Sequence, residues 1–441
     1  MLALRKIVAV ATVSSVALIA AEVANAGAFG IREQSATAQG LSFAGVASGS
    51  GGLSSMFWNP STITMSPGWQ GEWHASLIIP QARIKPEAPT PTLFFGPSGD
   101  VGQDAVLPAS YSTYQVNDRL WLGLATTSPF GLITKPNQAW AGQVYSRSSE
   151  IFSLNVNPTV GYKVTDWLSI GGGPVFQYFK VQLKRASPSS PLPAAAGTAL
   201  LPTAPSAILD GDDVGIGFTA GLTLTPFAGT SIGVGFRSAI DHELEGGLEL
   251  PYAYAPVKAK LTLPESLNVG LSQQITPDLK VHAGFEWTNW SRLKTSAVVG
   301  PAGPIAGAEI ELNYKDGYFY SIGAEYAINP ALTVRAGLAY EQSPIDTQVR
   351  STRLPDNDRI WASVGLGYKW SDKLSFDVGY THIFVDDTRI AIVPGHQDYI
   401  AGLPFLADVD SSVDIVSVAL RYRFDAAAPS VAPSAPIIRK Y

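Results

Sequence analysis

The chain has 441 residues, of which 46% are hydrophobic and 15% are charged, and its formal net charge is −6. This acidic balance argues against a nucleic-acid partner, because the chain has no basic domain to neutralise phosphates. Cysteine is absent, which excludes disulfides, thiol nucleophiles and cysteine metal sites.

The first residues of the chain, 1–26, predict a secretory signal peptide. Arg5 and Lys6 form a positive n-region, residues 7–21 form an apolar run, and residues 24–26 form an A-x-A cleavage box. The apolar run is short for a transmembrane anchor and ends in small residues. We therefore expect cleavage after this box and export of the chain.

The next segment, residues 27–67, lacks the alternation of a strand and is rich in glycines that break helices. Its apolar side chains include Phe29, Phe43, Phe57 and Trp58. A segment of about 40 residues with so small a core needs another surface to pack against.

Residues 68–424 alternate apolar and polar positions, and short turns alternate with much longer loops. The short turn signals lie at 117–118, 165–166, 226–229, 277–278, 329–330 and 371–372. They separate fourteen expected strands: 68–84, 105–117, 119–128, 150–164, 167–184, 212–225, 230–243, 258–275, 279–293, 309–328, 331–342, 358–370, 373–385 and 411–424. This pattern is typical of a membrane barrel, with tight turns at one mouth and long loops at the other.

The expected fold class is therefore all-β, a 14-stranded antiparallel transmembrane β-barrel in the outer membrane of a Gram-negative bacterium. We expect residues 27–67 to be a helical or irregular hatch that plugs the lumen, with Phe29, Phe43, Phe57 and Trp58 offering a hydrophobic site. The competing interpretation is a soluble β-sandwich or barrel with its apolar face inward.

The long loops are expected outside the cell and the short turns in the periplasm. The loop at 185–211 is apolar for an external loop and carries Leu200 and Leu201. It either covers its own apolar residues or forms a landing surface for a hydrophobic ligand. Residues 425–441 are rich in alanine and proline and are expected to be a disordered periplasmic tail.

Several segments, taken in order, resemble the FadL/TodX family of outer-membrane transporters for long-chain fatty acids and other hydrophobic compounds. They include GAFGIREQSATAQGLSFAGVAS at 27–48, MFWNPS at 56–61, SPFGLITKPNQAWAGQ at 128–143, LPESLNVGLSQQITPDLKVHAGFEWTNWSRL at 263–293 and YEQSPIDTQVRSTRLPDNDRIWASVGLGYKW at 340–370. The resemblance implies a monomeric barrel with an N-terminal hatch. It also implies external capture of the ligand, an internal hydrophobic site and lateral exit through the wall into the membrane lipid, without energy coupling.

The resemblance also implies roles for individual positions. Asn59 and Pro60 match the family's hatch motif, followed here by Ser61 where alanine is usual. The mature N-terminus, residues 27–29, would lie near the ligand. The family's third strand is kinked to open the wall, and Gly123 is either this kink or an ordinary small residue of the lumen.

The candidates for binding a fatty-acid carboxylate are Lys184, Arg185 and Lys315, and the alternative for each is a solvated loop or rim charge. If none faces the ligand, an uncharged compound such as an aromatic hydrocarbon is the alternative. A general porin and a surface receptor or adhesin are further alternatives, and lipopolysaccharide is an expected neighbour. The five histidines are scattered without ligand spacing, so we predict no catalytic residue, no metal site and no cofactor.

Overall fold

The computed structural model describes residues 28–294, 297–304 and 312–425. The predicted signal peptide, Gly27 and residues 426–441 of the predicted tail lie outside the described residues. The strands in the described residues form a single sheet that closes when the last strand pairs with the first, Gln70 opposite Arg423 and Glu87 opposite Leu406.

The described residues fill fourteen positions in the barrel wall, as the alternation predicted. The unbroken strands are β1 (Trp69–Glu87), β2 (Ala105–Gln115), β5 (Ser148–Lys163), β6 (Leu168–Ala186), β7 (Ser206–Leu224), β12 (Leu279–Thr288), β15 (Gly317–Asn329), β16 (Leu332–Gln342), β17 (Arg359–Lys369), β18 (Leu374–Val385) and β20 (Phe405–Arg423). Three positions are shared by broken strands: β3 (Leu120–Thr127) with β4 (Gly131–Thr134), β8 (Thr230–Arg237) with β9 (Ile240–Leu250), and β10 (Ala253–Leu263) with β11 (Ser266–Gln274). Three short strands, β13 (Val298–Gly300), β14 (Gly303–Pro304) and β19 (Thr388–Ile392), lie in the long loops.

The long loop expected between 243 and 258 is instead a continuation of the wall. β9 and β10 form a hairpin in which Glu243 lies opposite Lys260 and Glu245 opposite Lys258. These charges point outward, whereas Leu244 between them is buried. The sequence pattern indicated a loop here because the outward positions are charged. Charged outward positions are equally compatible with a strand that extends beyond the membrane.

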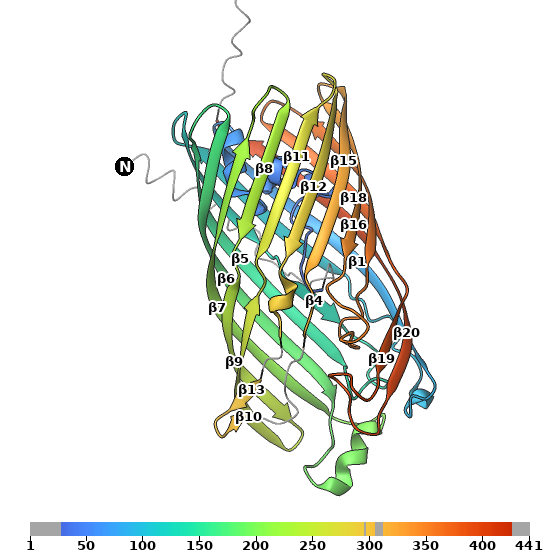
Figure 1. Cartoon of the computed structure of the whole chain (residues 1–441). Helices are drawn as coiled ribbons and strands as arrows, with labels where there is room; N and C mark the ends of the chain where they lie inside the picture. The colour runs from blue at the N-terminus through green and yellow to red at the C-terminus, as the bar shows by residue number, and fades with distance from the viewer. Residues whose placement is uncertain (1–27, 295–296, 305–311, 426–441) are drawn as a thin grey trace, which may run out of the picture.

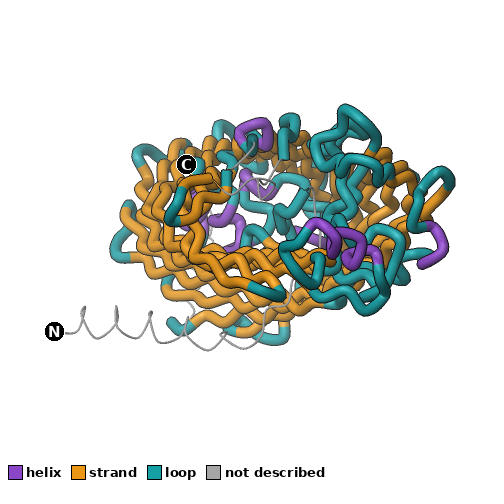
Figure 2. The backbone as a smooth tube through the Cα atoms, turned by 90° about the horizontal axis from the view of Figure 1, so that it is seen from below, coloured by secondary structure: helices purple, strands orange, loops and turns teal. Residues whose placement is uncertain are grey.

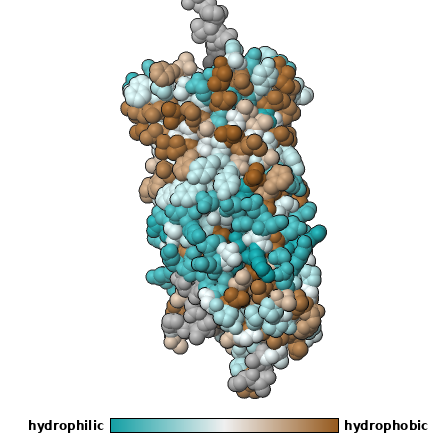
Figure 3. Space-filling model, turned by 45° about the vertical axis from the view of Figure 1, so that its right-hand side comes forward, coloured by the Kyte–Doolittle hydropathy of each residue, from teal (hydrophilic) through white to brown (hydrophobic). Residues whose placement is uncertain are grey.

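The two ends of the barrel differ as the turn pattern predicted. Short turns close the upper end in Figure 1, and long loops with η5 (Leu93–Phe95) and η6 (Pro193–Leu200) extend from the lower end. On β20, Val416 and Val418 are 40% and 49% exposed, whereas Ser417 between them is fully buried. On the face seen in Figure 3, apolar side chains gather over the upper part of the molecule, above a hydrophilic region. Apolar residues therefore face outward, as lipid contact requires.

The described part of the hatch, residues 28–67, lies inside the ring of strands (Figures 1 and 2). Its short helices are α2 (Ala36–Gln39), η2 (Val46–Ser48), η3 (Gly52–Phe57) and η4 (Pro60–Met65). Inward-facing glycines let its backbone touch the wall: a Cβ at Gly233 would lie 1.7 Å from the Ala47 carbonyl oxygen, and one at Gly337 would lie 2.1 Å from the Leu41 carbonyl carbon. None of the helices in the described ranges is long and apolar enough to cross a bilayer.

Candidate functional site

A cavity of about 330 Å³, the large cavity, lies between the hatch and the outer loops. Most of its lining is apolar and includes Phe29 of the hatch, Phe179 and Val181 of β6, Leu244 of β9 and Leu261 of β10. These residues face inward because alternate positions of a strand lie on the same face. A cavity of this size and character is typical of sites for small hydrophobic ligands.

The charged part of the lining comes from Arg185 at the end of β6 and from two outer loops, which contribute Arg353 and Asp398. The Nη1 of Arg353 donates to the carbonyl oxygens of Ser148 at 3.2 Å and Lys184 at 3.3 Å. Burial lowers the pKa of Arg353 to about 10, so its guanidinium stays charged at neutral pH. Burial raises the pKa of the Asp398 carboxyl, while His396 and both arginines act in the opposite direction.

A packed apolar core of the outer loops, the outer cap, adjoins the large cavity, because Tyr145, Tyr399 and Ile400 belong to both. Trp140 is fully buried in it and packs edge-to-face on Phe405, with ring centroids 5.6 Å apart. Arg147 ties neighbouring loops together, because its guanidinium donates to the Ala204 carbonyl at 2.7 Å and to the Gln143 side chain at 2.8 Å. The outer loops thus form a common core above the cavity.

Phe29, which lines the large cavity, belongs to a cluster of three aromatic rings. The ring of Phe29 lies 5.0 Å from that of Trp290 and 6.0 Å from that of Phe130, which is itself 6.0 Å from Trp290. On the other side of this aromatic cluster is the small cavity, of about 80 Å³, lined by Phe130, Trp290, Phe57 and Trp58. The aromatic cluster therefore lies between the two cavities, with Phe29 lining the large one and Phe130 and Trp290 lining the small one.

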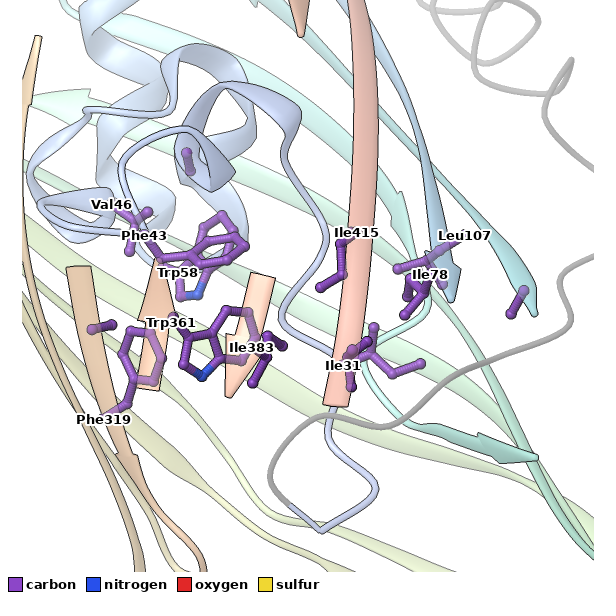
Figure 4. Packing of buried hydrophobic residues seen from close by; sticks show 14 residues of the cluster. Ile31, Phe43, Val46, Trp58, Ile78, Leu107, Phe319, Trp361, Ile383 and Ile415 are labelled. Atoms are coloured by element: carbon purple, nitrogen blue, oxygen red, sulfur yellow. The ribbon is translucent and has the colours of Figure 1, made fainter. Parts of the chain in front are cut away.

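The hatch residues that were predicted to form a hydrophobic ligand site are divided among the large cavity, the small cavity and the hatch core. Phe29 lines the large cavity, and Phe57 and Trp58 line the small one. Phe43 lines neither: it packs against Trp58 and Trp361 in the hatch core, with centroid distances of 5.7 and 6.0 Å (Figure 4).

The loop leucines differ in position. Leu200 packs against the outer cap and is half-buried, which favours the interpretation that this loop covers its own apolar residues. Leu201 is 49% exposed on the outer surface.

Of the predicted carboxylate ligands, only Arg185 lines the large cavity in the described part of the chain. Lys184 is its neighbour on the strand, so the alternation turns the Lys184 side chain to the other face. For Lys315 the structure favours the alternative of a solvated rim charge, because its ammonium pairs with Asp346 at 2.6 Å and its side chain is 68% exposed. Sequence reasoning missed Arg353 and Asp398, which lie in loops whose positions no local pattern indicates.

Of the two interpretations of Gly123, the structure favours an ordinary small residue of the lumen over a strand kink. Gly123 lies opposite Thr113 on β2 and Thr159 on β5, so the ladders on both sides continue through it. Its missing side chain makes room for the hatch, since a Cβ there would lie 2.9 Å from Met56 Cε.

The third wall strand is interrupted instead at residues 128–130, between β3 and β4. Pairing with β2 ends at Ser110 opposite Thr126, and the first residues of β2 pair with β1 alone. The Pro129 carbonyl accepts from the Ile31 backbone N–H at 2.7 Å, so this stretch pairs with the hatch. Pro108 in β2 and Pro129 have no backbone N–H to donate to a neighbouring strand. These two prolines are the signal in the sequence that could have indicated the wall interruption.

Asn59 and Pro60 attach the hatch to the wall. The Asn59 amide donates to the carbonyls of Ala47 at 2.6 Å and Leu222 at 2.9 Å, and its Oδ1 accepts from the Ser61 backbone N–H at 3.1 Å. Pro60 follows at the first position of η4, where its missing N–H is not needed. No group of His, Asp and Glu residues in the described ranges could hold a metal ion.

Comparisons with known proteins agree with this architecture. Residues 17–424 match the family model described as outer membrane protein transport protein (OMPP1/FadL/TodX). Outer membrane protein P1 of Haemophilus influenzae is 28% identical over 407 residues, covering 83% of this chain and 88% of that protein. The long-chain fatty acid transport protein of Salmonella typhi is 26% identical over 404 residues, covering 85% and 91%.

Solved structures share the fold. A FadL homologue from Pseudomonas aeruginosa superposes with a TM-score of 0.81 at 21% identity, covering 90% of this chain and 100% of that one. The toluene transporter TodX of P. putida superposes with a TM-score of 0.66 at 19% identity, covering 89% and 99%.

Proposed function

The chain belongs to the OMPP1/FadL/TodX family of outer-membrane transporters of hydrophobic compounds, and on that premise we propose that it takes up long-chain fatty acids. The protein is an outer-membrane β-barrel. The proposed uptake is passive, by a monomeric channel without catalytic activity. The ligand is captured at the loops, held in the large cavity and released sideways into the bilayer.

One observation carries the choice of a fatty acid: an apolar cavity is lined on its loop side by two arginines. Arg185 and Arg353 outnumber the single carboxylate of Asp398 in this lining. Guanidinium groups bind carboxylates through parallel N–H donors. Burying each methylene of an alkyl chain contributes roughly 0.8 kcal/mol, so the remaining apolar lining suits the tail. The ligand that this combination fits is an amphipathic anion.

The proposed exit is the wall interruption at residues 128–130. A continuous ladder seals a barrel laterally, because every backbone group is paired with the next strand. Here the backbone of Pro129 and Gly131 pairs with Ile31 and Phe29 of the hatch, which supports a role for the hatch in controlling this exit. A ligand leaving sideways remains in an apolar environment and never enters periplasmic water. Lipopolysaccharide is the proposed surrounding of the charged barrel exterior at the loop end.

An aromatic hydrocarbon is the second candidate ligand. The similarity to the toluene transporters TodX and TbuX favours it, as does Asp398, whose charge offsets one arginine. The two candidates differ in their need for the arginines, because a hydrocarbon has no group to pair with them.

The deciding experiment compares three ligands with the same purified protein. Binding of oleate, oleyl alcohol and toluene is measured by quenching of tryptophan fluorescence, and uptake by cells that express the protein is measured with radiolabelled compounds. We expect oleate to bind most tightly and to be taken up. Tighter binding of toluene, with no uptake of oleate, would support the hydrocarbon alternative and refute the fatty-acid proposal.

A further inference from the structure

Arg237 is half-buried and lines the small cavity with its guanidinium. It is the last residue of β8, where the seventh wall strand breaks, and it lines the small cavity beside Phe57. Its Nη2 donates to the Phe57 carbonyl oxygen at 2.8 Å, and its guanidinium carbon lies 4.4 Å from the centre of the Phe57 ring. Its Nη1 is buried and has no hydrogen-bond partner among the described residues. A buried N–H donor without an acceptor is unfavourable until an acceptor arrives.

The carboxylates that line the small cavity already have another partner. Glu286 pairs with Arg32 at 2.8 Å, and Glu341 lies 3.7 Å from the same guanidinium. Glu341 also accepts from the indole N–H of Trp361 at 3.1 Å. Within the described residues no carboxylate forms an ion pair with Arg237, although the negative charge of Glu286 is close enough to interact with it electrostatically. Among the cations that line the small cavity, Arg237 is thus the one that could pair with the carboxylate of a ligand.

The small cavity has the size of a head group. Its volume is about 80 Å³, whereas one water molecule occupies roughly 30 Å³ in the liquid. Two or three water molecules or one carboxylate therefore fit, but a long alkyl chain does not.

The position of the small cavity connects the two proposed stages of transport. Phe130 and Trp290 line it and, with Phe29, separate it from the large cavity. Pro129, in the wall interruption, lines it as well. A head group that leaves the large cavity for the interruption would pass through this space.

We propose that Arg237 forms a second carboxylate-binding site, which holds the fatty-acid head group between the large cavity and the wall interruption. The inference rests on the proposed function. A carboxylate that leaves Arg185 and Arg353 enters a region enclosed by aromatic rings, where an unpaired anion is strongly disfavoured. Arg237 supplies charge and a free N–H donor at that point, so the anion exchanges one guanidinium for another. An uncharged ligand with the same tail has no carboxylate to pair with Arg237, so its passage should not depend on this residue.

The test compares oleate with oleyl alcohol, which has the same tail and no charge. The full-length protein and its Arg237→Gln variant are expressed in the outer membrane, and uptake of each radiolabelled compound is measured. Losing one charged hydrogen bond should slow oleate uptake about tenfold or more, whereas uptake of oleyl alcohol stays within about twofold. Oleate binding to the purified variant should be unchanged, because Arg185 and Arg353 are intact. Arg237→Lys keeps the charge and should recover part of the rate.

The matched control is Arg389→Gln, because Arg389 pairs with Glu87 on the outer surface at 2.6 Å. Folding of each variant is checked by heat-modifiable mobility in gels. Unchanged oleate uptake in Arg237→Gln would overturn the inference while leaving the proposed function intact. An equal loss for oleate and oleyl alcohol would also overturn it, because Arg237 would then act only by supporting the hatch. Failure of the unaltered protein to take up oleate would refute the proposed function, and the inference with it.

Discussion

Replacing Arg353 with glutamine tests whether the large cavity recognises a carboxylate. Arg353 lies in the loop between β16 and β17, and its Nη1 donates to the Ser148 carbonyl oxygen and the Ser149 hydroxyl, both at 3.2 Å. Glutamine removes the charge and retains a shorter side chain with an amide donor. The change therefore distinguishes the contribution of the positive charge of Arg353 to ligand binding from the contribution of a polar side chain at this position.

The expected magnitude follows from the hydrogen bond that is lost. A hydrogen bond to a charged group contributes about 1.5–3 kcal/mol, which corresponds to roughly a 10- to 150-fold weaker oleate affinity. Oleyl alcohol should lose less than about twofold in affinity, because its hydroxyl does not need a cation. Arg353 also tethers its loop to β5 and β6, so part of the stability of the outer cap depends on it.

The assay is a titration of the purified variant with each ligand, followed by tryptophan fluorescence. The control is Lys315→Gln, which removes an exposed cation paired with Asp346 and should leave both affinities unchanged. Equal weakening of oleate and oleyl alcohol binding would show that Arg353 shapes the cavity and does not recognise the anion. Unchanged oleate binding would refute the assignment of the head group to this part of the cavity.

Three further changes follow from the same structure. Asp398 has a raised pKa, and its negative charge opposes an anionic ligand. Acidification that neutralises Asp398 should therefore tighten oleate binding as long as the ligand stays ionised. In titrations, the Asp398→Asn variant should bind oleate more tightly at neutral pH and should lose that pH dependence. Asn59→Ala leaves the Ala47 carbonyl and the Ser61 N–H without their partners, at a cost of roughly 2–4 kcal/mol, and hydrogen exchange should then accelerate in the hatch but not in the wall strands. Phe29→Ala removes apolar contact of about 1.5–3 kcal/mol, so it should weaken oleate and oleyl alcohol binding alike and reduce uptake of both; unchanged uptake of both would refute passage along the hatch.

The barrel could be predicted because its signals are local. Alternate exposure of Val416, Ser417 and Val418 follows from the two-residue period of a strand, and short turns mark the ends of neighbouring strands. The hatch was recognisable because residues 27–67 lack that period. The hairpin of β9 and β10 was missed because charged outward positions beyond the membrane resemble a loop.

The ligand site depended on contacts between distant parts of the chain. Phe29 and Arg185 were predicted and line the same cavity, but Arg353 and Asp398 reach it only because the outer loops pack together around Trp140. No sequence period describes such loops. The interruption of the third wall strand lies at residues 128–130 and not at Gly123, because the pairing of Pro129 with Ile31 depends on where the hatch lies.

The sequence by itself thus determined the class of fold, the positions of most strands and the presence of a plug, because these follow from side-chain alternation, or its absence, along single segments. Only the tertiary structure decided which charges face the cavity and where the third wall strand is interrupted. Closure of the barrel brings β3, β6 and the loops before β17 and β20 around one hatch, and the partners of Arg353 and Arg237 are set by that arrangement.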